Sequence, residues 1–73
     1  MVTLKEARAV RLLTIRELAD RAGVASSTVY LIENGRSVPR FAVIRRLSEA
    51  LGVDPTDVEE FAAAIEERGK VAA

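Results

Sequence analysis

Signals for helix starts and helix stops recur at short intervals along the chain and constrain its fold most tightly. Thr3 is followed three residues later by Glu6, and Thr14 by Glu17, which is the capping-box pattern of a helix N-terminus. Gly23 follows an apolar stretch of helical spacing, where a residue that adopts positive φ commonly ends a helix. No stretch alternates apolar and polar residues as a half-buried strand does. The sequence therefore predicts an all-α fold.

Apolar residues repeat at helical spacing in five segments with tight connections. We expect helices over residues 3–11, 14–23, 25–34, 40–51 and 54–69. The last segment begins with Asp54 as N-cap and Pro55 at the first helical position, and Gly69 is expected to end it. A chain of 73 residues allows one domain. We therefore expect a compact bundle of about five short helices over residues 1–69, with residues 70–73 as a frayed C-terminal tail.

Helices this short need tertiary packing, so the apolar stripes should form a common core. The segment over residues 40–51 has an apolar stripe made of Phe41, Ile44, Leu47 and Leu51. Core packing is the expected role of Val29, Ile32, Ile44, Leu47, Val58 and Phe61.

The second and third segments are joined by a short turn at residues 22–25. Two helices that cross through such a turn need a small residue at the crossing, which Ala19 supplies, and a residue able to adopt positive φ, which Gly23 supplies. Val29 and Ile32 lie on one face of the third segment and would anchor it to the core. Its opposite face would remain exposed. This spacing predicts a helix-turn-helix.

The net charge of zero is a cancellation between two halves of the chain. Residues 1–46 contain nine basic and four acidic residues, a net charge of +5. Residues 47–73 contain two basic and seven acidic residues, a net charge of −5. This asymmetry has two interpretations: a basic half that faces a polyanion, or ordinary solvated helix faces.

The composition excludes several kinds of site. The chain has no cysteine and no histidine, which removes disulfides, thiolate or imidazole zinc sites and imidazole acid–base catalysis. It also lacks a glycine-rich phosphate loop. We therefore expect no enzyme activity, no cofactor and no metal. No apolar run approaches the roughly 20 residues that cross a bilayer, so we expect no membrane partner and a cytoplasmic location.

One long stretch of the chain resembles a known family. TIRELADRAGVASSTVYLIENGRSVPRF, residues 14–41, resembles the helix-turn-helix of the Xre family, to which the phage lambda repressor and Cro proteins belong. LSEALGVDP, residues 47–55, resembles the family's fourth helix and the turn after it. The resemblance implies a lambda repressor-like fold. It also implies a homodimer that inserts its third helix, residues 26–34, into the major groove of a short palindromic DNA operator.

The resemblance also implies roles for individual residues. Base-facing positions correspond to Ser26, Ser27 and Leu31. Positions that contact the DNA backbone correspond to Thr14, Arg16, Thr28, Asn34, Arg36 and Arg40. A structural ion pair corresponds to Arg8 and Glu33. The stripe on the fifth helix covers the core, dimerises, or does both, and the candidate dimer contacts are Phe61 and Ile65.

The third helix departs from the family pattern in ways that leave alternatives open. It lacks the arginines and long amides that read bases through two hydrogen bonds. Ser26 and Ser27 could be N-cap residues and not base contacts. Leu12 replaces a frequent glycine at the end of the first helix, and Ile15 replaces a frequent glutamine near a phosphate.

Two functions therefore remain. The first is a sequence-specific regulator of transcription that binds double-stranded DNA, in the form of a repressor. The second is a protein-interaction module or an antitoxin-type protein, which would use an apolar patch around Tyr30 and Leu31 to bind a protein partner.

Overall fold

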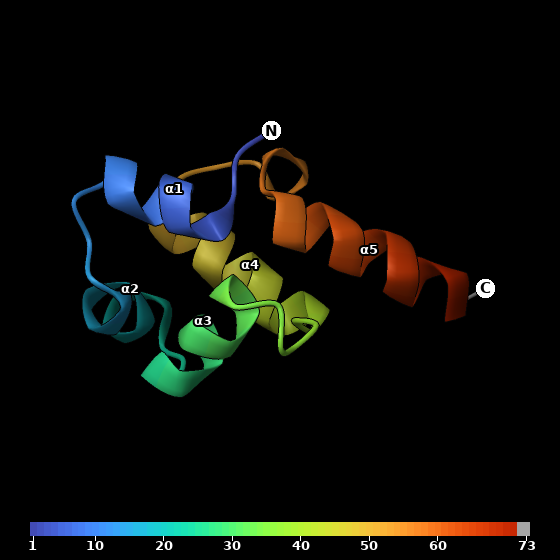
Figure 1. Ribbon diagram of the computed structural model, residues 1–73, viewed down its shortest axis with the longest axis horizontal. Coiled ribbons are helices and arrows are strands. Elements are labelled where there is room, and N and C mark those ends of the chain that lie inside the picture. The colour runs from blue at the N-terminus through green and yellow to red at the C-terminus, as the bar shows by residue number, and fades with distance from the viewer. Residues whose placement is uncertain (72–73) are drawn as a thin grey trace.

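The structure is a computed structural model that describes residues 1–71. These residues form five α-helices and one short 3-10 helix, which confirms the predicted all-α bundle (Figure 1). The elements are α1 (Leu4–Val10), α2 (Ile15–Ala22), α3 (Ser26–Glu33), α4 (Phe41–Leu51), η1 (Pro55–Asp57) and α5 (Glu59–Val71). Helices α1 to α4 gather into one body, and the C-terminal half of α5 projects from it. No helix within residues 1–71 has the length and apolar character that a bilayer crossing requires.

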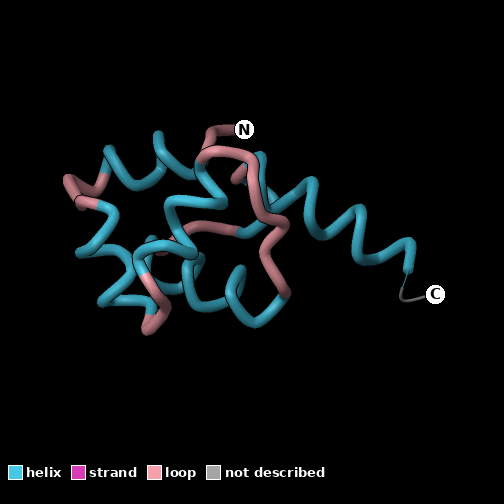
Figure 2. The backbone as a smooth tube through the Cα atoms, turned by 60° about the horizontal axis from the view of Figure 1, so that its bottom comes forward, coloured by secondary structure: helices cyan, strands magenta, loops and turns pink. Residues whose placement is uncertain are grey.

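Both predicted capping boxes are present. The Thr3 hydroxyl accepts a hydrogen bond from the N–H of Glu6 at 3.1 Å, and the Glu6 carboxylate accepts one from the N–H of Thr3 at 2.8 Å. Thr14 and Glu17 repeat this geometry at the start of α2. Gly23 ends α2 with φ of 71°, in the left-handed region that favours glycine. Figure 2 shows the loops, in pink, that join the helices at these ends.

The prediction of one continuous helix over residues 54–69 is wrong. Pro55–Asp57 forms a 3-10 turn, Val58 is extended, and α5 begins only at Glu59. The reason is a pairing with the N-terminal strand-like segment, where Val2 forms an isolated parallel bridge with Val58. The N–H of Val2 donates to the Asp57 carbonyl at 2.9 Å, and the N–H of Glu59 donates to the Val2 carbonyl at 2.7 Å. These bonds occupy backbone groups that a continuous helix would use.

The prediction that Gly69 ends the last helix is also wrong. Helix α5 continues through Gly69 to Val71, and Gly69 does not adopt positive φ. A glycine inside a helix costs about 1 kcal/mol relative to alanine but does not by itself stop the helix. Of the predicted tail, Lys70 and Val71 therefore belong to α5, and residues 72–73 lie outside the described residues.

One buried cluster joins all five α-helices. Its members are Leu4, Ala7, Leu13, Leu18, Ala19, Ala22, Val29, Ile32, Ile44, Leu47, Leu51, Val58, Phe61 and Ala64. All six residues expected in the core belong to it. Phe41 is the exception in the stripe of α4, because it is the first residue of the helix and is 46% exposed. The apolar stripe of α4 therefore extends one turn beyond the part of the helix that the core buries.

Candidate nucleic-acid interface

The crossing of α2 and α3 fixes the orientation of the third helix. Ala19 is 1% exposed, and the N–H of Val24 donates to its carbonyl at 3.0 Å, so the turn closes directly over this small side chain. Val29 and Ile32 then bury the inner face of α3. This arrangement matches the predicted helix-turn-helix and leaves the outer face of α3 exposed.

The start of α3 is open. Ala25 is the N-cap residue and its side chain makes no cap hydrogen bond, so Ser26 and Ser27 are the first two helical residues and not caps. Both serines are exposed. Within residues 1–71, no hydrogen bond uses the N–H of either serine. The N-terminal end of α3 therefore presents two free backbone N–H groups and two hydroxyls at the positive end of the helix dipole. The first turn of α3 contains no acidic residue that would oppose this positive end.

The exposed face of α3 continues from these serines. Tyr30 and Leu31 follow Ser27 at spacings of three and four residues and are 53% and 38% exposed. Thr28 is half-buried on the flank of the helix. Short hydroxyls can hydrogen-bond base edges at close approach or through water, and a leucine can contact a thymine methyl group. The face therefore offers hydroxyl and apolar groups to a base edge, although it has no arginine, lysine or long amide.

The start of α2 is closed by comparison. The capping box occupies the N–H groups of Thr14 and Glu17 and places the Glu17 carboxylate at this end of the helix. The hydrogen bond from the Thr14 N–H lowers the pKa of Glu17 below its usual value of 4.5, so the carboxylate is charged at neutral pH. Arg16 is exposed beside it, whereas Ile15 packs partly against the core. A phosphate approaching Thr14 would therefore meet Arg16 and also a negative charge.

Two exposed arginines lie in the segment between α3 and α4. Arg36 follows the end of α3, and Arg40 is the N-cap residue of α4. Like α3, α4 starts without a side-chain cap and without an acidic residue in its first turn. Asn34 lies close by, but its Nδ2 donates to the Tyr30 carbonyl at 2.8 Å and so closes the end of α3.

The structure brings Arg8 and Glu33 together. Arg8 Nε donates to Glu33 Oε2 at 2.7 Å, and Nη2 donates to Oε1 at 3.0 Å. Nη1 of Arg8 also donates to the Leu13 carbonyl at 2.8 Å. The hydrogen bonds to Glu33 raise the pKa of Arg8, so its guanidinium remains charged across the neutral range. The pair joins α1 to the last residue of α3.

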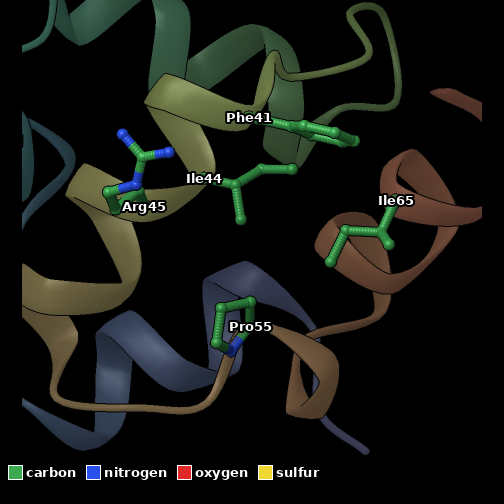
Figure 3. A pocket seen from close by; sticks show the side chains of 5 residues that line it. All are labelled: Phe41, Ile44, Arg45, Pro55 and Ile65. Atoms are coloured by element: carbon green, nitrogen blue, oxygen red, sulfur yellow. The ribbon is translucent and has the colours of Figure 1, made fainter. Parts of the chain in front are cut away.

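The two candidate dimer contacts have different environments. Phe61 is fully buried in the core, so a second chain cannot touch it, and its assignment as a dimer contact is wrong. Ile65 is half-buried and borders an open apolar groove of about 320 Å³. Figure 3 shows Phe41 and Ile65 on opposite sides of this groove, which Ile44, Arg45 and Pro55 complete.

Sequence reasoning missed Arg68 and the conformation of Leu12. Arg68 Nε donates to the Pro39 carbonyl at 2.9 Å and Nη2 to the Val38 carbonyl at 2.7 Å, which ties α5 to the loop beside Arg40. No sequence signal marks this contact, because any residue can supply the carbonyls. Leu12 adopts φ of 57° and is 89% exposed. The sequence signal for this positive φ was that Leu12 stands where the family often has a glycine.

Comparisons with known proteins agree with this geometry. Residues 2–61 match the helix-turn-helix domain family. In Bacillus subtilis (strain 168), the HTH-type transcriptional repressor RghR and the uncharacterized HTH-type transcriptional regulator RghRB are each 43% identical to the chain over 51 residues. That stretch is 68% of this chain and 38% and 37% of the two relatives, so the chain spans just over a third of their length. No solved structure matches the chain. The chain belongs to the helix-turn-helix domain family.

Proposed function

We propose that this protein is a regulator of transcription that binds double-stranded DNA sequence-specifically and acts as a repressor. The observation that carries the proposal is the open, acid-free start of α3, which presents Ser26 and Ser27 on a helix held firmly from its inner face. Backbone N–H groups and the positive end of a helix dipole attract anions such as phosphates, and the N–H groups can donate hydrogen bonds to acceptor atoms on base edges. As a regulator of this kind, the protein would act in the cytoplasm.

In the proposed complex, α3 with the following residue, residues 26–34, enters the major groove. Ser26, Ser27 and Leu31 would face the bases, through short hydrogen bonds, bridging waters and contact with a thymine methyl group. The groups proposed to hold the DNA backbone are Thr14, Arg16, Thr28, Asn34, Arg36 and Arg40. Of these, Arg16, Arg36 and Arg40 are exposed and positively charged. Contacts to the DNA backbone increase affinity but do not select the sequence. The acidic C-terminal part of the chain would face away from the phosphates.

Repression is proposed from the relatives. One of the two curated relatives is named a transcriptional repressor, and the similarity covers most of this chain. A helix-turn-helix domain represses most simply by occupying its operator. Selection of duplexes from a random pool tests the sequence preference. Ser27→Ala should change which sequences are selected, whereas Arg36→Ala should weaken binding to all of them.

A homodimer is proposed as the binding form, with a second copy of the chain at the groove beside Ile65. Two recognition helices about 34 Å apart would read a short palindrome. The groove exposes Phe41 and part of Ile65, which are apolar groups that dimerisation would cover. Sedimentation of the wild type and Ile65→Asp tests this, with Val10→Asp as a control at an exposed apolar site on α1. If all three proteins sediment as monomers, the dimer is contradicted.

A second candidate function rests on Tyr30 and Leu31. Both are exposed on α3, where a polar residue would suit DNA better, and together they could bind a protein partner, as in an antitoxin-type protein. The two functions differ in what a Leu31→Asp variant does. If the protein is an interaction module, the wild type does not bind DNA and the Leu31→Asp variant loses its protein partner. If the protein is a regulator, the wild type binds DNA and the Leu31→Asp variant does not.

A further inference from the structure

Arg68 links the projecting half of α5 to the loop that carries the two exposed arginines. It lies outside the part of the chain that matches the helix-turn-helix family, and its side chain is half-buried while Glu67 and Gly69 beside it are exposed. Its guanidinium donates to two consecutive backbone carbonyls, those of Val38 and Pro39, at 2.7 and 2.9 Å. This is a two-pronged contact between segments that are 29 and 30 residues apart in sequence.

The loop depends on this contact for its polar anchoring. Residues 37–40 have no regular secondary structure. In the described part of the chain, no other hydrogen bond reaches the backbone of residues 37–39. A hollow of about 160 Å³ remains between the loop and α5, so packing across this gap is incomplete. The buried ring of Pro39 and the Arg68 guanidinium are therefore what fix the path of the loop.

We propose that Arg68 is a positioning residue, which holds the loop so that Arg36 and Arg40 meet the DNA backbone together. The proposal rests on the proposed function. Val38 and Pro39 lie between the two arginines, and Arg40 is the N-cap of α4, so a shift of these carbonyls would move Arg36 relative to the start of α4. The position of α5 and the affinity for DNA would then be coupled, and the coupling would act in both directions.

The test measures binding to a labelled duplex of about 30 base pairs, roughly three helical turns, across a salt series. The proteins compared with the wild type are Arg68→Lys, Arg68→Ala and Lys70→Ala. Lysine keeps the charge but cannot form the two-pronged contact. We expect both Arg68 variants to bind about tenfold more weakly, with a salt slope shallower by about 0.9 for each phosphate that the arginines no longer neutralise. Lys70→Ala removes the same charge from an exposed site on α5 and should leave affinity and slope near those of the wild type. Wild-type affinity and slope in Arg68→Lys would overturn the proposal, because charge alone would then suffice.

A second measurement needs no DNA. Backbone ¹⁵N relaxation should show lower order parameters for residues 36–38 in Arg68→Ala than in the wild type or Lys70→Ala. Unchanged order in Arg68→Ala would overturn the positioning role. If the loop loses order as expected but the wild-type protein does not bind duplex DNA, the positioning role is supported and the proposed function is what fails.

Discussion

Arg8 and Glu33 form a two-pronged ion pair across α1 and the end of α3, with donor–acceptor distances of 2.7 and 3.0 Å. Their side chains are 13% and 5% exposed, so solvent screens the pair only weakly. The pair holds the C-terminal end of α3, while Ala19 and Val29 hold its beginning and middle against the core. Helix α3 is therefore held to the rest of the bundle along its length.

Removing either partner of this pair should be more harmful than removing both. Arg8→Met would leave the nearly buried Glu33 carboxylate without its counter-charge, and the cost should be about 3–5 kcal/mol. That is a large part of the roughly 5–15 kcal/mol available to a small domain. Chemical denaturation of Arg8→Met, Glu33→Leu and the double variant measures the coupling. Single variants that lose less than about 1 kcal/mol would show that the pair behaves like an exposed one.

Leu12→Gly should stabilise the protein. Leu12 has φ of 57°, a left-handed conformation that costs a residue with a Cβ about 1–2 kcal/mol, and its side chain is 89% exposed, so glycine sacrifices little packing. The greater flexibility of glycine in the unfolded chain offsets about 0.5–1 kcal/mol of this gain. We expect a rise in Tm of about 3 °C. Leu12→Ala is the matched control, since it keeps the strained backbone, and equal Tm values for the two variants would contradict this explanation.

Ser48→Ala should also stabilise the protein. Ser48 is 4% exposed inside α4, and its Oγ has no hydrogen-bond partner among residues 1–71. Removing a buried hydroxyl without a partner and improving helix propensity should together add about 1 kcal/mol to the free energy of unfolding. Ser37→Ala, at an exposed loop position, should change this free energy by less than about 0.5 kcal/mol. A lower stability for Ser48→Ala would mean that the hydroxyl has a role in the folded protein.

Stability should fall in acid partly through the helix caps. The hydrogen bond from the Thr3 N–H lowers the pKa of Glu6, and that from the Thr14 N–H lowers the pKa of Glu17, both from the usual 4.5. The two carboxylates therefore contribute fully to the free energy of unfolding above pH 4.5, and this contribution is lost as the pH falls through their lower folded-state pKa values. Denaturation between about pH 6 and pH 2.5 should show a smaller acid loss for Glu6→Gln/Glu17→Gln, because glutamine can cap without titrating. An equal loss in both proteins would assign acid sensitivity to other carboxylates.

Local signals in the sequence predict most of the fold. Threonine–glutamate pairs specify capping boxes within three residues, and Gly23 specifies a left-handed turn, so α1 and α2 are predicted with their caps. The break at Val58 cannot be predicted in this way, because its partner Val2 is 56 residues away. The same reason explains why Arg68 was missed.

The site is predicted only as far as the helix-turn-helix pattern extends. The pattern places Ser26 and Ser27 on the exposed start of α3, but only the structure shows that Ala25 takes the cap position and frees both serines. For Phe61, apolar spacing alone cannot tell a core residue from a dimer contact, because both kinds of contact use the same stripe of a helix.

The proposed function requires that α3 and the arginines of the α3–α4 loop bind duplex DNA. The most direct test is fluorescence anisotropy of a labelled duplex, taken from the random-pool selection, from about 50 to 200 mM salt. We expect the logarithm of the binding constant to fall linearly with the logarithm of salt concentration, by about 0.9 for each phosphate that the protein neutralises. Arg36→Ala/Arg40→Ala should make this slope shallower by about 1.8, whereas Lys5→Ala, an exposed charge on α1, should not change it. No binding by the wild type at about 50 mM salt, or one slope for all three proteins, would contradict DNA binding by these residues.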